Sequence, residues 1–221
     1  PAALADDWEE QNAKLLAKYI NQEHELAHLC EIFSRESIPH MPLKGSCIRC
    51  FFPSPELREM CDLDILVPQE LEEQTHQIML AEGYSFIESH TTSNNREYHK
   101  APFLNVEIHT ALYPQEYPES AYFNKVWSRA ERTGSFSYKL SWDDFYIFAV
   151  AHTYKHYYLM GTGIRSVLDL YVMEEALNGQ LNRSYIRAEL KKLKMLAFYD
   201  TICEVSRFLF SKEETALSDA A

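Results

Sequence analysis

Two aspartates separated by a single leucine, inside an apolar run, most constrain how this chain folds. Asp62 and Asp64 stand in the run DLDILV at residues 62–67. Side chains two residues apart on a strand share a face, so we expect both carboxylates on one side and Leu63 and Ile65 in a core. Adjacent anions are unfavourable without a cation, and carboxylate oxygens suit Mg²⁺. The run therefore indicates a strand with a metal site, although an ordinary half-exposed strand also alternates in this way.

Two flanking segments favour the metal site over the ordinary strand. Upstream, the run PLKGS at residues 42–46 predicts a strand that ends in a small-residue turn. Gly45 would let the backbone approach a ligand there, and a following helix would offer free N–H groups to phosphate. Downstream, the run LNVEIH at residues 104–109 alternates apolar and polar residues, so Glu107 and His109 are expected to share the polar face of another strand.

A Gly-Ser turn, an Asp-x-Asp strand and a later strand with one carboxylate occur in this order in the nucleotidyltransferase superfamily that includes DNA polymerase beta. More closely, the chain resembles an uncharacterised bacterial nucleotidyltransferase-like family with Leu-Lys-Gly, an arginine shortly before Asp-x-Asp-x-Leu-Val, and Glu-x-His. The matching elements are Leu43-Lys44-Gly45, Arg58, residues 62–67 and Glu107-Ile108-His109. The likeness covers about residues 38–112 by motif, but the gap between Ser46 and Asp62 is longer than the superfamily usually shows.

The resemblance implies a site and a reaction. Its catalytic and metal-binding residues would be Asp62, Asp64 and Glu107, which would hold two Mg²⁺ ions, with Mn²⁺ as an alternative. Its nucleotide-binding residues would be Lys44, Gly45, Ser46 and Arg58. The reaction would move a nucleoside monophosphate from a nucleoside triphosphate to a hydroxyl or phosphate acceptor, with loss of pyrophosphate. The acceptor, the nucleotide base and the oligomeric state stay open.

Two other classes of function are compatible with the same pattern. The first is a non-catalytic nucleotide-binding or protein-interaction module that keeps the fold without turnover. Whether the three carboxylates converge on one metal site would distinguish the enzyme from this module. The second is a metal-dependent phosphohydrolase or phosphotransferase, which differs in the products formed from a triphosphate. Similarity of fold alone does not decide between them.

Composition limits the partners. The chain has 221 residues and a formal net charge of -12, which argues against extended binding to DNA or RNA because such binding relies on Lys and Arg. No apolar stretch approaches the roughly 20 residues that cross a bilayer, and residues 1–10 lack the pattern of a signal peptide. We therefore expect a cytoplasmic protein without a membrane partner. The five scattered cysteines do not suggest a disulfide framework, and Cys47 and Cys50 have redox spacing without thioredoxin-type surroundings.

Hydrophobic periodicity predicts an α+β fold with a C-terminal helical subdomain, and the resemblance implies that its sheet is a nucleotidyltransferase-like mixed sheet flanked by helices. The predicted domains are an N-terminal helix within residues 1–37, a catalytic core over 38–135 and a helical subdomain over 136–221. Strands are expected at about 40–45, 61–67, 84–90, 96–100 and 104–112, with a turn at 91–95. Helices are expected at about 6–36, 69–82, 141–160, 164–178, 182–192 and 194–211, with a capping pattern at Ser141 and Asp144.

Two histidines of the helical region need a separate interpretation. His152 and His156 stand four residues apart on the helix predicted over 141–160, a spacing that can bind zinc. The residues between them supply no glutamate for a metalloprotease. We therefore favour either a place beside the substrate in a cleft or ordinary packing for this pair. His109 is a further residue that could line such a cleft.

Overall fold

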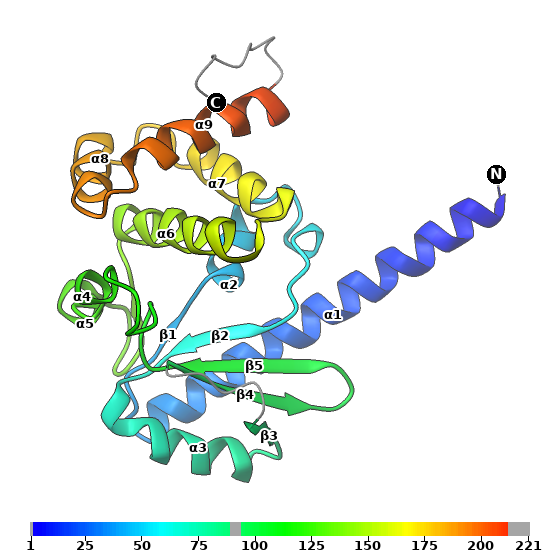
Figure 1. Cartoon of the computed structure of the whole chain (residues 1–221). Coiled ribbons are helices and arrows are strands. Elements are labelled where there is room, and N and C mark those ends of the chain that lie inside the picture. The colour runs from blue at the N-terminus through cyan, green and yellow to red at the C-terminus, as the bar shows by residue number, and fades with distance from the viewer. Residues whose placement is uncertain (1, 89–93, 212–221) are drawn as a thin grey trace. The chain divides into compact units, whose positions relative to one another are not determined.

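The computed structural model describes residues 2–88 and 94–211, and the chain divides into two compact units, residues 1–139 and 140–221 (Figure 1). The boundary between the units lies close to residue 136, where the sequence analysis begins the helical subdomain. The three-part division into 1–37, 38–135 and 136–221 stays a prediction about independent folding. The turn predicted at 91–95 falls mostly outside the described residues.

The first unit contains the predicted mixed sheet (Figure 1). It has five strands in the order β1-β2-β5-β4-β3, which the sequence did not predict. Its strands are β1 (Met41–Pro42), β2 (Leu63–Leu66), β3 (Ser85–Ile87), β4 (Asn95–Lys100) and β5 (Leu104–His109). The pair β2 and β5 is parallel, with Asp64 opposite Glu107, and the other neighbouring strands are antiparallel. The parallel register therefore sets the two motif carboxylates side by side on adjacent strands.

Two helices pack on the apolar face of this sheet. They are α1 (Ala2–Arg35) and α3 (Glu72–Ala81), which a 3₁₀ turn, η3 (Gln69–Leu71), precedes. Apolar residues three and four apart on α1 meet the inward side chains of the strands, in a core formed by Leu29, Phe33, Ile38, Met60, Leu63, Ile65, Val67, Met79, Tyr84, Tyr98, Val106 and Ile108. Burying one large apolar side chain of this kind contributes about 1.5–3 kcal/mol. The predicted inward direction of Leu63 and Ile65 is confirmed.

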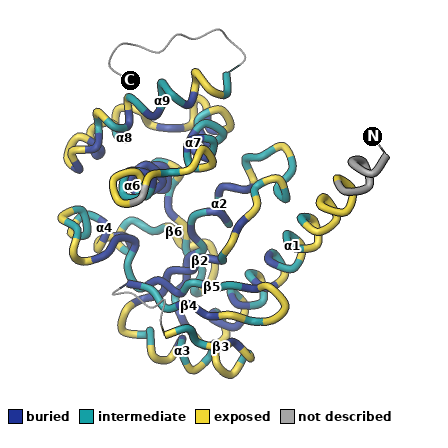
Figure 2. Tube along the Cα trace, turned by 45° about the vertical axis from the view of Figure 1, so that its right-hand side comes forward, coloured by how far each residue is buried: buried dark blue, intermediate teal, exposed yellow. Residues whose placement is uncertain are grey.

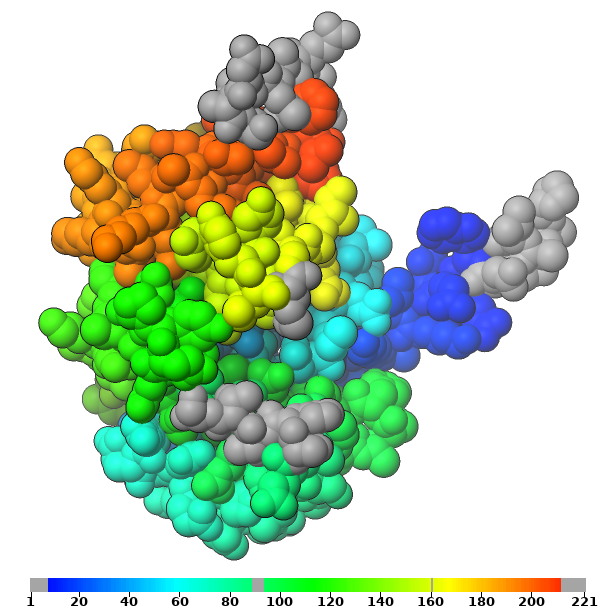
Figure 3. All heavy atoms as spheres, in the orientation of Figure 1, coloured from blue at the N-terminus to red at the C-terminus, as the bar shows by residue number. Residues whose placement is uncertain are grey.

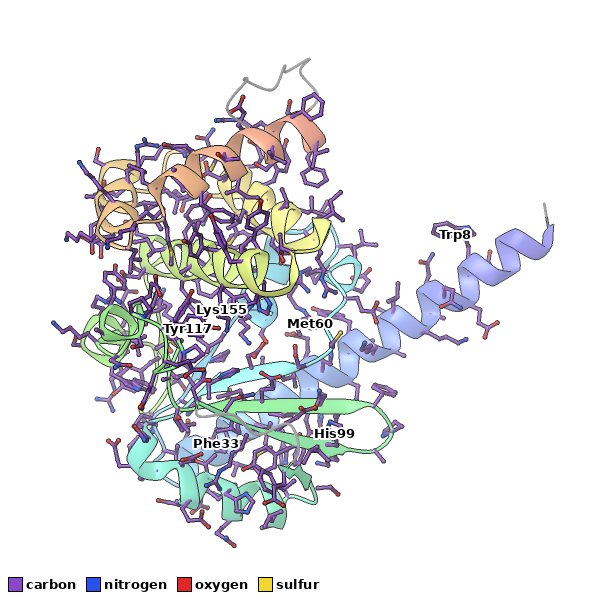
Figure 4. The ribbon with its side chains drawn as sticks, in the orientation of Figure 1. Trp8, Phe33, Met60, His99, Tyr117 and Lys155 are labelled. Carbon is purple, nitrogen blue, oxygen red and sulfur yellow. The ribbon has the colours of Figure 1, made fainter. Side chains whose placement is uncertain are left out.

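The two halves of α1 differ in burial. Figure 2 shows exposed residues along much of the N-terminal half of α1, whereas buried residues gather where strands β2, β4 and β5 lie. The N-terminal half extends beyond the sheet (Figure 1), and its blue atoms stand out from the neighbouring residues in Figure 3. Trp8 on this half is 69% exposed, whereas Phe33 near the other end is fully buried (Figure 4). Polar contacts fix the packed half, because Glu25 accepts hydrogen bonds from the Tyr84 hydroxyl at 2.7 Å and from Lys100 Nζ at 2.8 Å. The sheet therefore holds only the C-terminal half of the helix.

Short elements connect the longer ones of the first unit. Between β1 and β2 lie α2 (Gly45–Ile48) and the 3₁₀ turns η1 (Arg49–Phe51) and η2 (Pro55–Leu57), and α2 is the helix expected after the turn. After β5 come α4 (Ser120–Phe123), α5 (Val126–Arg129) and a hairpin of β6 (Glu131–Arg132) and β7 (Tyr138–Lys139). The sequence analysis missed these last four elements because pieces of two to four residues are too short to show a period.

The second unit is helical, as predicted. It consists of α6 (Trp142–Met160), α7 (Ile164–Ala176), α8 (Arg183–Lys192) and α9 (Leu196–Phe210). The predicted cap is present, since Ser141 Oγ accepts a hydrogen bond from the Asp144 backbone N–H at 3.2 Å. Helix α6 packs against α7 and α8, and α9 packs against α7 and α8. In the described part of the chain, no helix combines the length and apolar character that crossing a membrane requires.

Candidate active site

Three donor groups converge on the polar face of β2 and β5. Asp64 and Glu107 are opposite each other in the parallel register, and His109 lies two residues further along β5. His109 Nε2 is 2.7 Å from Asp64 Oδ1 and 3.2 Å from Glu107 Oε2. One donor atom from each residue lies within 4.8 Å of the other two. Two carboxylate oxygens and one imidazole nitrogen at this spacing can hold a divalent cation.

The local reason for this convergence is strand alternation. Val106 and Ile108 fill the core on one face of β5, so Glu107 and His109 must lie on the other. The same parity on β2 places Asp64 on that polar face, where it is only 2% exposed. A buried carboxylate is stable only with charged or hydrogen-bonding partners. The predicted sharing of one face by Glu107 and His109 is confirmed.

Lys44 supplies the positive charge in this group. Its Nζ donates a hydrogen bond to Asp64 Oδ1 at 2.6 Å and lies 3.5 Å from His109 Nε2 and 3.8 Å from Glu107 Oε2. Its backbone φ is 49°, in the left-handed region that non-glycine residues seldom adopt. The sequence predicted that Lys44 binds the nucleotide, but it did not predict the pairing with Asp64. No local pattern indicates a contact between two residues that are 20 positions apart.

The ion pair sets the charge of both partners. Burial works to raise the pKa of Asp64, but the Lys44 ammonium and the hydrogen bond with His109 hold that pKa well below its usual range. Burial also opposes the charged form of Lys44, yet the carboxylates of Asp64 and Glu107 raise its pKa overall. Asp64 and Lys44 are therefore both charged at neutral pH.

Asp62 has a different environment from Asp64. It precedes β2 and does not belong to the three-donor group. Burial, followed by the charges of Asp64 and Glu107, raises its pKa to about 6. Asp62 is thus close enough to be repelled by both carboxylates, and the Lys44 ammonium offsets this repulsion only in part. The role of Asp62 as a metal ligand stays a prediction. The third donor of the group is His109, for which the sequence predicted only a place beside a cleft.

The turn after β1 is shaped by contacts that the sequence did not reveal. A Cβ added to Gly45 would lie 2.5 Å from Met60 Sδ, so an alanine there would require Met60 (labelled in Figure 4) to move. The same Cβ would be 3.6 Å from Arg58 Nη1, which places the Arg58 guanidinium beside the turn. Ser46 Oγ is buried and has no hydrogen-bond partner among the described residues. A buried hydroxyl in this state is unfavourable unless a ligand completes it.

Arg49 connects the segment after this turn to α1. Its guanidinium is buried and donates hydrogen bonds to Glu23 Oε1 at 2.8 Å and Gln22 Oε1 at 3.0 Å. It also lies over the Tyr19 ring, 4.9 Å from the centroid. The sequence analysis gave Arg49 no role, because the partners are 26 to 30 residues away. The packed half of α1 thus positions the segment that follows Gly45 and Ser46.

The cysteine pair beside the turn is not arranged for redox chemistry. Cys47 Sγ donates to the Pro42 carbonyl oxygen at 3.2 Å, and burial raises the pKa of this thiol to about 12. Since the thiolate is the reactive form, Cys47 is unreactive at neutral pH.

The predicted histidine pair lies on α6 of the second unit. The rings of His152 and His156 contact each other edge to face, with centroids 4.4 Å apart, and His152 also lies near Phe148. Within the described ranges, neither histidine belongs to a group of three or more potential metal ligands. The place of this pair beside a substrate stays a prediction.

Comparisons with solved structures agree with this fold. Two structures of the antibiotic-resistance factor ANT(2″)-Ia are similar to the chain at a TM-score of 0.56. The solution structure shares 11% identity over 82% of this chain and 97% of that chain. The crystal structure in complex with adenylyl-2″-tobramycin shares 13% identity over 79% of this chain and 99% of that chain. At such identities the likeness concerns the fold alone.

The sequence comparisons give the family. A comparison with curated proteins found no match. The model of a family described as "Uncharacterised nucleotidyltransferase" matches residues 1–211, which is nearly the whole chain and includes every motif residue of the site. The chain therefore belongs to this nucleotidyltransferase family and is a transferase enzyme.

Proposed function

We propose that the enzyme is metal-dependent and moves a nucleoside monophosphate from a nucleoside triphosphate to a hydroxyl or phosphate acceptor. The observation that carries this proposal is the convergence of Asp64, Glu107 and His109 on adjacent parallel strands. The turn at Gly45 and Ser46 directly follows Lys44, whose ammonium lies in the same group. Converging acidic donors that can hold a metal are what metal-dependent nucleotidyl transfer requires.

The donor set fits a divalent cation. The Lys44 ammonium lies among the three donor atoms of Asp64, His109 and Glu107. Donor atoms that stabilise an ammonium ion by their negative charge would stabilise a metal cation for the same reason. Asp64, Glu107 and Asp62 would hold Mg²⁺, with two ions as the proposed number, and the His109 nitrogen also admits Mn²⁺. When bound, the metal would neutralise phosphate oxygens and polarise the phosphorus under attack.

The protein's own residues take the other roles. Lys44 and Arg58 would pair with phosphate oxygens, and the Ser46 hydroxyl would donate to one of them and so gain the partner it lacks. The acceptor oxygen would form a bond to the α-phosphorus while the bond from that phosphorus to the β-phosphate oxygen breaks, releasing pyrophosphate. Glu107 is partly exposed, and its carboxylate would accept the proton from the acceptor hydroxyl.

The acceptor we propose to test first is a hydroxyl group of a small molecule. The similar structure of ANT(2″)-Ia contains adenylyl-2″-tobramycin, a small molecule that carries an adenylyl group. The net charge of -12 also makes a cationic small molecule more suitable than a polyanionic nucleic acid. A panel of amino sugars and other small alcohols, with phosphate esters as a second set, would cover both acceptor types.

Ligand-dependent melting tests the proposal without knowledge of the acceptor. A ligand that binds only the folded state at a hundredfold excess over its dissociation constant adds about 2.7 kcal/mol of stability. We expect a nucleoside triphosphate with Mg²⁺ or Mn²⁺ to raise the melting temperature, and much less with chelator. Arg58→Ala should weaken this shift, whereas His28→Ala, which removes a contact to Glu82 elsewhere in the unit, should not. No shift with any of the common triphosphates at millimolar concentration would contradict the proposal.

Product analysis separates the enzyme classes. With a productive acceptor we expect pyrophosphate and a nucleotidyl-acceptor adduct in equal amounts. Release of inorganic phosphate without an acceptor would instead identify a phosphohydrolase. Nucleotide binding without any product from the acceptor panel would contradict the proposed transfer.

A further inference from the structure

The position of the Lys44 ammonium within the acidic group has a consequence for metal binding. Its Nζ lies within 2.6–3.8 Å of the facing donor atom of Asp64, His109 and Glu107. These donor atoms belong to the same three residues that form the potential metal group. A metal ion and the ammonium cannot both contact them, because the two cations would overlap and repel each other.

The surroundings of Lys44 allow its head group to leave. Its side chain is a flexible four-carbon chain, and its Cα immediately precedes the Gly45-Ser46 turn. Near that turn lie the buried Ser46 hydroxyl, which lacks a partner, and the Arg58 guanidinium. A triphosphate at the turn would give the displaced ammonium a new anionic partner.

We propose that Lys44 is a built-in counter-ion that competes with the divalent metal for Asp64 and Glu107, and that it transfers to the triphosphate when the metal binds. This inference rests on the proposed function, because it concerns the same site. Its consequence is cooperative binding: the metal releases Lys44 for the nucleotide, and the nucleotide holds Lys44 away from the metal ligands. By linkage, each ligand raises the affinity for the other by the same factor.

Manganese binding without nucleotide tests the competition directly. The free Mn²⁺ signal in electron paramagnetic resonance gives the dissociation constant for the wild type, Lys44→Met and Lys14→Met. Lys14→Met is a matched control, because Lys14 pairs with Glu10 on the exposed surface of α1. We expect Lys44→Met to bind Mn²⁺ at least tenfold more tightly than the wild type and the control. Equal affinities in all three proteins would overturn the proposal.

A second measurement uses only the wild type and does not depend on how the variant folds. Acetylation of lysine side chains, followed by peptide mass spectrometry, reports how accessible and nucleophilic each amine is. Mn²⁺ should increase the acetylation rate of Lys44 several-fold relative to chelator, with the Lys14 rate unchanged. A non-hydrolysable triphosphate added with Mn²⁺ should reduce the Lys44 rate again. An unchanged Lys44 rate in Mn²⁺ that is shown to be bound would also overturn the proposal.

The outcomes distinguish this proposal from the proposed function. Tight Mn²⁺ binding by Lys44→Met and none by the wild type, even with triphosphate, would support the competition but contradict a metal-dependent transferase. Cooperative binding of Mn²⁺ and triphosphate by the wild type with equal Mn²⁺ affinity in Lys44→Met would support the transferase but remove the role of Lys44.

Discussion

The two faces of the parallel pair β2 and β5 carry opposite chemistry on the same backbone. On one face, Leu63, Ile65 and their neighbours on β5 pack beneath α1 and α3 in an apolar core. On the other, Asp64, Glu107 and His109 surround the Lys44 ammonium. Adjacent residues of one strand therefore serve different purposes. The apolar face fixes the position of the backbone, and the polar face uses that fixed position to hold like charges close together.

Substitutions on the two faces should consequently have different effects. A change on the apolar face removes packing and should lower the free energy of unfolding with little effect on binding by the molecules that remain folded. A change on the polar face should alter charge balance and ligand binding more than packing. The following predictions test this contrast, from the largest expected change in stability to the smallest.

Ile65→Ala should have the largest effect on stability. Ile65 is fully buried between Asp64 and Leu66, and its truncation should lower the free energy of unfolding by about 2–5 kcal/mol through lost burial and a cavity. Urea denaturation followed by circular dichroism gives this value. Below the unfolding transition, the affinity for metal and triphosphate should stay near that of the wild type. A large loss of affinity in fully folded Ile65→Ala would show that the two faces are not independent.

The two aspartates of the motif should respond differently to neutralisation. Asp64→Asn removes a charge that is paired with Lys44, and in chelator it should lower the free energy of unfolding by about 2 kcal/mol. Asp62→Asn removes a charge that Asp64 and Glu107 repel, so stability should stay level or rise. From the sequence alone, relief of repulsion is expected at Asp64 as well, and the Lys44 pair reverses that expectation. Parallel urea titrations at pH 7 compare the variants, and an equal response would contradict this assignment of charges.

Replacing Glu25 tests whether one buried carboxylate on the core side makes the free energy of unfolding depend on pH. Burial works to raise the pKa of Glu25, but hydrogen bonds from Lys100 and Tyr84 lower it below its usual value. A carboxylate with a lowered folded-state pKa stabilises the fold above its unfolded pKa of about 4.3, and this contribution is lost as the pH falls through the folded-state pKa. Glu25→Gln should therefore be less stable than the wild type by about 1 kcal/mol at pH 7.

The measurement for Glu25 is a series of denaturation curves between pH 7 and pH 3. The difference between wild type and Glu25→Gln should be constant above pH 5 and shrink toward the acid end. A difference that instead grows on acidification would mean that the carboxylate is unfavourable in the folded state. Glu10→Gln, at an exposed position on α1, is the control and should show no comparable difference.

Trp8→Ala should have the smallest effect. The ring is 69% exposed on the part of α1 that extends beyond the sheet, so its removal should change the free energy of unfolding by no more than about 0.5 kcal/mol. The same urea titration measures it. A loss above 1 kcal/mol, or one that depends on protein concentration, would show that this half of α1 is packed against another surface in solution.

Much of the fold could be predicted from periodicity. The long helices, the mixed sheet and the cap at Ser141 agree with expectation, because each leaves a repeated or local pattern in the sequence. The pieces between β5 and α6 did not, since they are too short for a pattern. In the site, alternation predicted the polar faces on which Asp64 and Glu107 lie in their own strands, and the register of β2 against β5 then set them side by side.

The sequence by itself determined which side chains lie on which face, because a strand alternates its side chains regardless of what surrounds it. Only the tertiary structure decided which charges meet. The pairing of Lys44 with Asp64 depends on the backbone turn at residue 44 and on the register of β2 against β5. The replacement of Asp62 by His109 in the three-donor group depends on that register as well. Distances between segments far apart in the sequence arise from packing, and no local pattern encodes them.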